Sequence, residues 1–249
     1  MQVTRIGIGL GQDLAKVLSS IEKPPEGTDL VVYTGQEFVV GGDTQVVRDT
    51  DPPGALVRDL VEGRIDAAVR GTLPANETLS ALRRATGVPQ LERIALLETA
   101  GGIRFLLAPV GVDEGFTVSG KCSLARKGRE IARRFGLPEQ VGFLSGGRYG
   151  DVGRSRDVDR SLADAELAAR LSGGKHYEIL IEDAIRECGT IIAPDGITGN
   201  LIFRTLVFLG GGAGHGAPVV NIGHVFVDTS RASPDYAKAI TLAHVLLNE

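Results

Sequence analysis

Short apolar runs alternate with amphipathic stretches along this chain, and the alternation strongly limits the folds that it can adopt. An apolar run over residues 4–10 is followed by a helical stretch over 12–22 and by a second apolar run over 29–34. Runs of this length between helical stretches are typical of strands in a parallel sheet that is buried on both faces. The sequence therefore predicts a layered α/β protein.

The alternation continues to the end of the chain and predicts how the sheet is divided. Two short strands are expected to pair through Gly101-Gly102, and the best candidate for a domain boundary lies there. We expect one α/β domain over 1–100, with 228–249 returning to it, and a second over 101–227. The other predicted strands are 46–49, 67–70, 93–98, 103–108, 141–145, 190–193 and 219–226, and the other predicted helices are 53–62, 76–86, 121–135, 157–171, 177–187 and 234–247.

Composition argues against several classes of protein. The 249 residues are 43% hydrophobic, which is enough for one large core or two small ones. A net charge of −4 makes nucleic acid an unexpected partner. The sequence has no run of about 20 apolar residues and no apolar core of a signal peptide, so no membrane span is expected. Cys122 and Cys188 lie far apart, as expected for reduced thiols of a cytoplasmic protein.

The segment APDGITGN, residues 193–200, lies where a predicted strand passes into a predicted helix near Asn200. One interpretation is an anion-binding wall, because helix N-termini attract anions and glycines let the backbone approach a ligand. The other is a helix start that Asp195 or Thr198 caps, and spacing alone favours this cap. The candidate binding residues are Asp195, Gly196, Thr198, Gly199 and Asn200.

A second junction, SGGRYGDVGRSR over 145–156, follows the strand at 141–145. It combines glycines and hydroxyls with arginines, which bind phosphate with two parallel hydrogen bonds. A solvated surface loop that ends in a helix cap explains the same residues equally well. The pattern matches neither the Rossmann nor the P-loop glycine motif. The candidate phosphate-binding residues are Ser145, Gly146, Gly147, Arg148 and Arg154.

A third junction, DTSRASPD over 228–235, follows a strand that ends near Val227, and RGTLPANE over 70–77 is a weaker junction of the same kind. Ser233 is expected to cap the last helix, with Pro234 in its first turn. The functional interpretation places Arg231 and Asp235 at a ligand-binding cleft. The four histidines are scattered and are interpreted as structural, and no cluster has the spacing of metal ligands, so no metal site is expected.

Four of these segments together resemble the phosphate acyltransferase superfamily, which contains phosphotransacetylases, phosphotransbutyrylases and PlsX-type phosphate acyltransferases. The most specific is IIAPDGITGNLIFRTL (191–206), which resembles the DG-x-x-GN segment of that family. The others are AVRGTLPANETLSALRRATG (68–87), VGFLSGGRYGDVGRSRDVDRSLADAELA (141–168) and VFVDTSRAS (225–233). Within the superfamily, the chain is most similar to the methanogen marker protein 4, or MtxX-type, group, some of whose members carry a methyltransferase label.

The resemblance implies an isocitrate/isopropylmalate dehydrogenase-like (phosphotransacetylase-like) fold, with two α/β domains, an interdomain cleft and a homodimer. It implies movement of an acyl group between phosphate and a thiol such as coenzyme A, without a tightly bound cofactor. The expected ligands are an acyl phosphate or phosphate and coenzyme A. A methyltransferase-related protein of methanogenesis and a non-catalytic binding protein on the same fold are the alternatives.

The resemblance also implies roles for individual residues. Ser230 and Arg231 match the Ser-Arg pair that would hold the phosphate, and Asp235 would act as the base toward the thiol. Gly199 and Asn200 match the Gly-Asn pair, and Ser145 matches the phosphate loop. A histidine of the family near position 74 is absent, because residues 71–74 read Gly-Thr-Leu-Pro.

Overall fold

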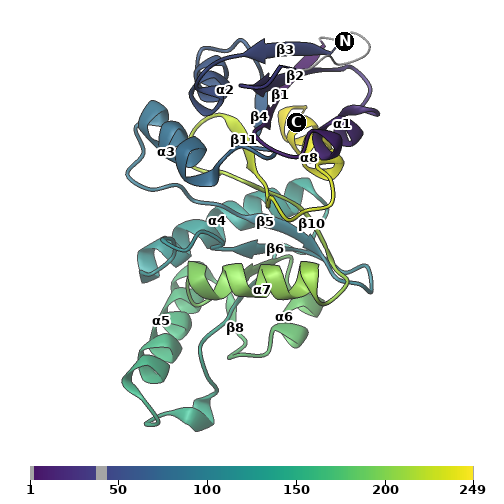
Figure 1. Ribbon diagram of the computed structural model, residues 1–249. Helices are drawn as coiled ribbons and strands as arrows, with labels where there is room; N and C mark the ends of the chain where they lie inside the picture. Colours follow the sequence, from purple (N-terminus) through teal and green to yellow (C-terminus); the bar gives the residue numbers. More distant parts are fainter. Residues whose placement is uncertain (1–2, 38–43, 249) are drawn as a thin grey trace. The chain divides into compact units, whose positions relative to one another are not determined.

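The structure, a computed structural model that describes residues 3–37 and 44–248, divides into two compact units (Figure 1). Unit 1 comprises Met1–Leu91 and His215–Glu249, and unit 2 comprises Glu92–Gly214. The sequence-based boundaries lay at 100/101 and 227/228. The chain returns to unit 1 before residue 228 because the strand Val225–Asp228 pairs with Ala67–Val69 of that unit.

Unit 1 contains a mostly parallel sheet in the order β3-β2-β1-β4-β11-β10. Only β10 runs antiparallel, where Ala217 and Pro218 pair with Asp228 and Val227 of β11. The strands are β1 (Thr4–Leu10), β2 (Thr28–Thr34), β3 (Gln45–Arg48), β4 (Ala67–Val69), β10 (Ala213–Pro218) and β11 (Val225–Asp228). Because β1, β4 and β11 are parallel, their carboxyl ends lie at one edge of the sheet.

Helices cover both faces of the unit 1 sheet, as expected for buried parallel strands (Figure 1). Helices α2 (Pro52–Val61) and α3 (Ala75–Thr86) pack together on one face, over a core that includes Tyr33 and Phe226. Helices α1 (Leu14–Ile21) and α8 (Ala237–Leu247) lie on the other face. Gly7 of β1 is closely packed, because a Cβ there would lie 2.6 Å from the end of the Ile65 side chain.

The strands of unit 2 follow one another in the order β5-β6-β9-β7-β8. Strands β5 and β6 form the predicted hairpin, whose antiparallel register confirms that prediction. The strands β6, β9, β7 and β8 are parallel to one another. The five strands of this unit are β5 (Ala95–Glu98), β6 (Arg104–Ala108), β7 (Val141–Phe143), β8 (Lys175–His176) and β9 (Thr190–Ile192).

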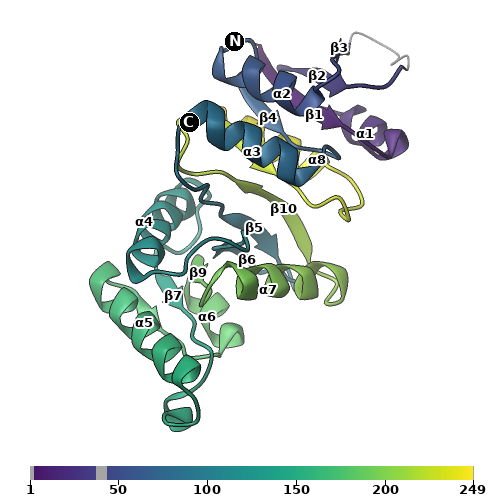
Figure 2. The same cartoon turned by 60° about the vertical axis from the view of Figure 1, so that its left-hand side comes forward.

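Four helices cover the unit 2 sheet. Helices α4 (Val118–Arg134) and α5 (Arg156–Ser172) pack together on one face, as Figure 2 shows. Helices α6 (Ile181–Glu187) and α7 (Gly196–Phe208) lie on the other. Helix α4 comes so close to the sheet that a Cβ on Gly128 would lie 2.4 Å from Thr190. A short 3-10 turn, η1 (Tyr149–Asp151), interrupts the loop after β7.

The structure corrects four sequence-based boundaries. The strand predicted over 219–226 is confirmed only at its end, because residues 220–224 form a loop between β10 (Ala213–Pro218) and β11, which begins at Val225. The helix predicted from 177 begins at Ile181, after a turn in which Glu178 has φ 55. Helix α7 begins at Gly196, and α8 begins at Ala237 with Tyr236 as its N-cap, so Ser233 does not cap it.

Candidate functional site

The carboxyl ends of β6, β7 and β9 lie at one edge of the unit 2 sheet, because these strands are parallel. Ligands of open α/β sheets bind beyond such an edge. Three loops leave the strands there: 109–117 after β6, 144–155 after β7 and 193–195 after β9. Two of them contain candidate residues from the sequence, so the structure gathers these candidates at the edge where ligands bind.

Asp195 caps helix α7, as one of the two sequence interpretations predicted. Its Oδ1 accepts hydrogen bonds from the amide of Thr198 at 2.7 Å and from the Thr198 hydroxyl at 2.9 Å. The amide of Gly199 donates to the carbonyl oxygen of Asp195 at 3.0 Å. The polar groups of Asp195 and Thr198 therefore form the start of the helix themselves.

The rest of this segment holds the loop after β6 in place. The Gly196 amide donates to the carbonyl oxygen of Glu114 at 3.0 Å, and Asn200 Nδ2 donates to that of Val110 at 3.1 Å. A Cβ on Gly199 would lie 1.9 Å from the carbonyl oxygen of Pro109. The Gly-Asn pair thus fits a structural requirement, since only glycine allows this approach.

A buried lysine lies at the same edge, at the start of α4. Lys121 is 3% exposed, and its Nζ donates to the carbonyl oxygen of Gly115 at 2.8 Å. Burial lowers the pKa of Lys121, while the nearby charges of Asp164 and Asp195 oppose this shift. The sequence did carry a signal for it, because Lys121 occupies the apolar stripe of α4 with Leu124, Ala125, Gly128, Ile131 and Ala132.

The loop after β6 also contains a buried ion pair. Glu114 is 1% exposed, and its Oε1 lies 2.6 Å from Nε of Arg93. Burial raises the pKa of Glu114, and the attraction of Arg93 opposes the shift. A Cβ on Gly111 would lie 1.9 Å from Arg93, so this loop packs tightly around the pair. The pair supports the loop against which α7 begins.

Ser145 follows β7 and is buried, with 3% exposure. Its Oγ lies 2.9 Å from the carbonyl oxygen of Gly147 and 2.9 Å from Nε2 of His176. The Gly146 amide donates to Ser161 Oγ at 2.8 Å. The structure therefore joins Ser145 to a histidine that no sequence motif marked.

The two candidate arginines of this loop lie at the surface. Arg148 is exposed. The guanidinium of Arg154 is 75% exposed and lies 2.8 Å from Asp151. Arg154 is thus bound to a carboxylate of its own loop, whereas the Ser145 hydroxyl bonds to Gly147 and His176.

The carboxyl ends of β1, β4 and β11 form the corresponding edge in unit 1. Arg70 is 4% exposed and connects the loops there, because it donates to Asp228 at 2.5 Å, to the carbonyl oxygen of Leu73 at 2.7 Å and to that of Thr229. Thr72 Oγ1 accepts from the amides of Gly11 at 3.0 Å and Gln12 at 3.2 Å. These bonds hold three loops together.

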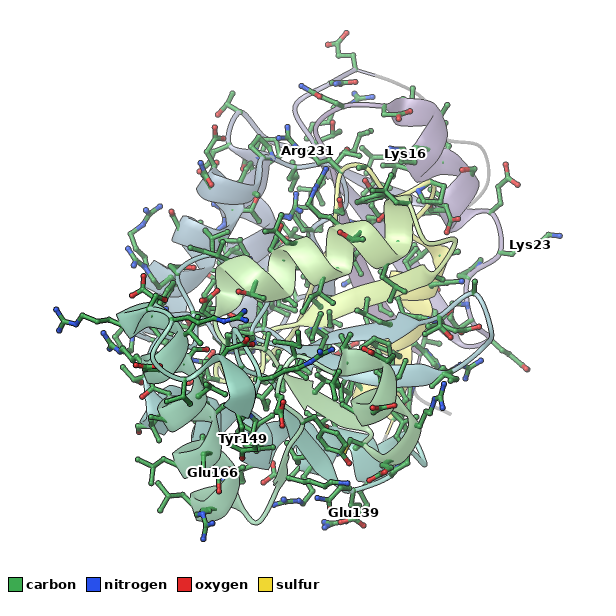
Figure 3. All side chains as sticks on the ribbon, turned by 90° about the horizontal axis from the view of Figure 1, so that it is seen from below. Lys16, Lys23, Glu139, Tyr149, Glu166 and Arg231 are labelled. Atoms are coloured by element: carbon green, nitrogen blue, oxygen red, sulfur yellow. The ribbon has the colours of Figure 1, made fainter. Side chains whose placement is uncertain are left out.

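Ser230, Arg231 and Asp235 lie in the loop after β11 at this edge. Ser230 Oγ accepts from the Ala232 amide at 3.2 Å, and Asp235 accepts from the Ala237 amide at 3.0 Å. Arg231 is exposed, and its carbonyl oxygen accepts from Lys16 Nζ at 2.9 Å. The ammonium group of Lys16 also lies 3.3 Å from the Asp13 carboxylate, and Figure 3 labels Lys16 and Arg231.

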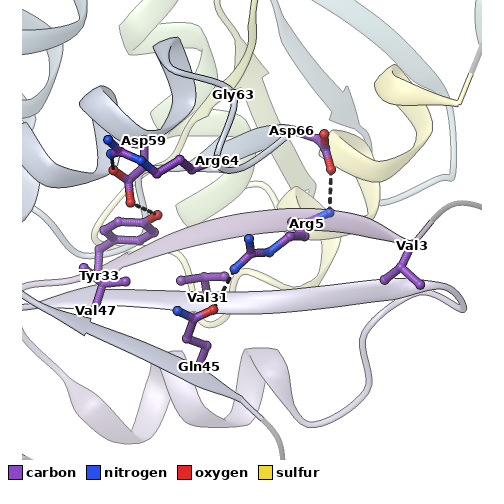
Figure 4. A pocket seen from close by; sticks show the side chains of 10 residues that line it. All are labelled: Val3, Arg5, Val31, Tyr33, Gln45, Val47, Asp59, Gly63, Arg64 and Asp66. Carbon is purple, nitrogen blue, oxygen red and sulfur yellow. Dashed lines mark hydrogen bonds and ion pairs between the residues drawn. The ribbon is translucent and has the colours of Figure 1, made fainter.

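A cavity of about 400 Å³ in unit 1 is lined by none of the candidate residues. Figure 4 shows Tyr33 donating to Asp59, and Arg5 donating to Asp66 and Gln45, around it. Arg64 also pairs with Asp59. The charged groups around this cavity thus bond to one another.

Residues 3–37 and 44–248, which the structure describes, contain no group of three or more side chains of the types His, Cys, Asp and Glu that could hold a metal ion. Within the same ranges, every helix is too short or too polar to cross a membrane.

Comparison with known proteins gives close relatives among curated sequences. The chain is 49% identical over 251 residues to a Methanosarcina mazei protein named "Putative methyltransferase mtx subunit X", and the match covers 97% of this chain and 90% of that one. It is 47% identical to the protein of the same name from Methanosarcina barkeri, covering 97% and 93%. No family model matches the chain.

Solved structures show the same fold at low sequence identity. A branched-chain phosphotransacylase from Enterococcus faecalis has a TM-score of 0.72 at 17% identity, covering 98% of both chains. A phosphotransacetylase from Streptococcus pyogenes has 0.66 at 17% identity, covering 98% of this chain and 94% of that one. A 4-hydroxythreonine-4-phosphate dehydrogenase from Klebsiella pneumoniae has 0.61 at 12% identity, covering 98% and 100%. The phosphotransacetylase-like α/β fold expected from the sequence is therefore confirmed.

Proposed function

The chain belongs to the family of the mtx subunit X proteins, and we propose that it is an acyltransferase that moves an acyl group between phosphate and a thiol such as coenzyme A. The observation that carries this proposal is the loop after β11 at the carboxyl edge of unit 1, which contains Ser230 and the exposed Arg231. A hydroxyl and a guanidinium beyond the ends of parallel strands suit a phosphate group. The names of the similar structures support the same substrate class.

The reaction needs three kinds of group. The thiolate attacks the acyl carbon and phosphate leaves, so an anion clamp, a base for the thiol and donors for the carbonyl oxygen are required. We assign Ser230 and Arg231 to the clamp and Asp235 to the base. Asp235 is exposed, and its Oδ1 accepts a hydrogen bond from the Ala237 amide at 3.0 Å.

We also propose phosphate-binding groups within unit 2 itself. Ser145, with Gly146, Gly147, Arg148 and Arg154, belongs to a loop at the carboxyl edge of its sheet. In this proposal the segment Asp195–Asn200 acts mainly through the loop 109–117, which it holds in position. Coenzyme A enters as a co-substrate, and no tightly bound cofactor is required. Both cysteines are free thiols, as in a cytoplasmic protein.

A homodimer is part of the proposal, and helix α7 offers its interface. Ile197 and Leu201 are four residues apart on one side of α7 and are 51% and 61% exposed, and Leu209 just beyond the helix is 83% exposed. The only buried residues of α7 are two glycines, Gly196 and Gly199. An apolar helix so little covered by its own chain suits contact with a second copy.

The test is a thermal-shift titration with phosphate, acetyl phosphate, coenzyme A and acetyl-coenzyme A. A ligand at 100 times its Kd stabilises the folded state by about 2.7 kcal/mol. We expect these ligands to raise the melting temperature of wild type, and Arg231→Ala to lose this increase. Arg126→Ala is the control and should keep it, because Arg126 is an exposed arginine of α4 that pairs with Glu130. Turnover of acetyl phosphate with coenzyme A is measured next. Absence of any shift and of any turnover contradicts the proposal.

A methyltransferase is the second candidate, because the curated relatives carry that word in their names. It predicts methyl transfer from a pterin or corrinoid donor, with no exchange between acetyl phosphate and coenzyme A. Binding of phosphate without any turnover instead indicates a non-catalytic protein on the same fold.

A further inference from the structure

Three side chains of unit 2 form a continuous chain of hydroxyl, imidazole and carboxylate. Ser145 Oγ lies 2.9 Å from His176 Nε2, and His176 Nδ1 lies 3.3 Å from Glu166 Oε2. The His176 side chain is 2% exposed, so solvent hardly reaches the imidazole between its two partners. A nucleophile bonded to a base that a third group orients is the geometry of nucleophilic catalysis.

The fold explains how the three residues meet. Strand β8 pairs in parallel with β7, and Phe143 is opposite His176. Ser145 follows Phe143 by two residues, and its amide donates to the carbonyl oxygen of Glu178 at 2.7 Å. Glu166 reaches the imidazole from α5, which packs on both strands. Each member is thus supplied by a different element.

Tyr149 and Arg170 complete the surroundings of the carboxylate. The Tyr149 hydroxyl donates to Glu166 Oε2 at 2.9 Å and lies 3.1 Å from His176 Nδ1, and Figure 3 shows Tyr149 beside Glu166. Arg170 Nε donates to Glu166 Oε1 at 2.8 Å. The hydrogen bonds from Arg170 and Tyr149 lower the pKa of Glu166, so it stays ionised and orients the imidazole.

Counting hydrogens defines two states of this chain. The Gly147 carbonyl oxygen and the Glu166 carboxylate can only accept, so they take the hydroxyl hydrogens of Ser145 and Tyr149. In that state both nitrogens of His176 face oxygen atoms and must carry hydrogens. If the imidazole keeps only the Nδ1 hydrogen, which points to Glu166, then Nε2 accepts the Ser145 hydroxyl. This neutral state is the one in which a histidine activates a serine.

We propose that Ser145 is a nucleophile that accepts the acyl group of an acyl phosphate, with His176 as its base and Glu166 as a positioning residue, so that two steps replace the direct attack of the thiolate on the acyl phosphate. The substrate class rests on the proposed function. Ser145 Oγ bonds to the acyl carbon, the bond from that carbon to the phosphate oxygen breaks, and phosphate leaves with the electron pair. The hydroxyl proton passes to His176 Nε2 and from there to the departing phosphate. In the second step a thiol or water attacks the acyl carbon and gives its proton to Nε2, the bond from that carbon to Ser145 Oγ breaks, and Nε2 protonates the Ser145 oxygen.

The position of Ser145 suits this role. It follows β7 by two residues at the carboxyl edge of the sheet, and the next residue, Gly146, is exposed. Gly146 and Gly147 carry no side chains that would obstruct an approaching acyl group. The activated state is reached when Nε2 has lost its hydrogen and the Ser145 hydroxyl hydrogen turns from Gly147 to Nε2.

The experiment detects the acyl-enzyme directly. The full-length protein is mixed with acetyl phosphate, quenched in acid and analysed by intact mass and peptide mapping. We expect one acetyl group on the peptide that contains Ser145. Ser145→Ala removes it, and His176→Asn slows its formation by about 100-fold or more. Ser119→Ala, which changes an exposed serine on α4, leaves it unchanged.

Rescue by a conservative variant separates positioning from mere folding. In Glu166→Gln the rate of acylation should fall, because the imidazole loses the carboxylate that orients it. Glu166→Asp should restore part of the rate, because it keeps a carboxylate on the same side of α5. A purely structural role would change the yield of folded protein without changing the acylation rate of the folded fraction.

Two outcomes distinguish this inference from the proposed function. Turnover of acetyl phosphate and coenzyme A with no acetyl group on Ser145 at any pH overturns the nucleophile and leaves the acyltransferase intact. An acetyl group on Ser145 without transfer to coenzyme A supports the nucleophile and contradicts coenzyme A as the acceptor. An equal acetyl label on Ser145→Ala and wild type also overturns it.

Discussion

Gly196 begins helix α7 so close to Gly111 that a Cβ on Gly196 would lie 1.5 Å from the Gly111 carbonyl oxygen. A hydrogen bond from the Gly196 amide to the Glu114 carbonyl oxygen, at 3.0 Å, holds the same two segments together. A side chain of any size must therefore move one of two backbones. These two contacts join the DGITGN segment closely to the loop after β6, which the sequence alone did not indicate.

Gly196→Ala should destabilise the protein by about 3 kcal/mol or more, because no rotamer of a single methyl group relieves a backbone clash. Urea unfolding measures this loss. Gly150→Ala is the matched control, since a Cβ there meets nothing within 4 Å, and it should change stability by less than about 0.5 kcal/mol. Equal stability of the two variants would show that the loop 109–117 moves freely.

Asp195→Ala should cost about 1 kcal/mol, because it removes the acceptor for the amide and hydroxyl of Thr198. Asp195→Asn keeps an acceptor oxygen and should stay within about 0.5 kcal/mol of wild type. If an anion also binds beside this residue, Asp195→Asn should tighten phosphate binding, because a negative charge is removed. Calorimetric titration with phosphate distinguishes the cap alone from a cap that borders an anion site.

The sequence predicted local elements well and side-chain partnerships poorly, for physical reasons. Strand β1 and the hairpin of β5 and β6 follow from apolar runs whose pattern depends only on local burial. The start of α8 could not be predicted in this way. Ser233 and Pro234 have the sequence of a helix cap, but the Tyr236 amide donates to Ser20 Oγ, 216 residues away. A tertiary contact therefore decides where that helix begins.

The candidate site shows the same division. Asp195 and Thr198 could be interpreted as a cap because both partners lie within one turn. His176 could not be joined to Ser145, because only the pairing of β7 with β8 brings them together. Lys121 was detectable in principle, since a lysine on an apolar helical stripe is either misplaced or buried for a reason.

Arg70→Ala should destabilise the protein by about 3–5 kcal/mol, because it leaves a largely buried carboxylate, Asp228, without its cation. The side chains of this pair are only 5% and 12% exposed. The double variant Arg70→Ala/Asp228→Ala should lose less than the sum of the two single variants. Additive losses in chemical unfolding would show that the two side chains act independently.

Leu201→Glu should convert the proposed homodimer into a monomer, because it places a charge on the apolar side of α7 where Leu201 is 61% exposed. Light scattering coupled to size exclusion measures the mass. Leu167→Glu is the matched control on α5, where Leu167 is 49% exposed, and it should leave the mass unchanged. A dimer that survives Leu201→Glu would assign the interface to another surface.

Lys121→Met should reveal the cost of burying the Lys121 charge through its dependence on pH. Burial lowers the pKa of Lys121 from 10.5, so the unfolded chain binds more protons than the folded one between the lowered value and 10.5. Wild type should therefore gain stability relative to Lys121→Met as pH rises through that window. Urea unfolding from about pH 7 to about pH 10 measures this difference. Lys23→Met, which changes an exposed lysine, should give a constant difference. A constant difference for Lys121→Met as well would show that Lys121 stays charged and solvated.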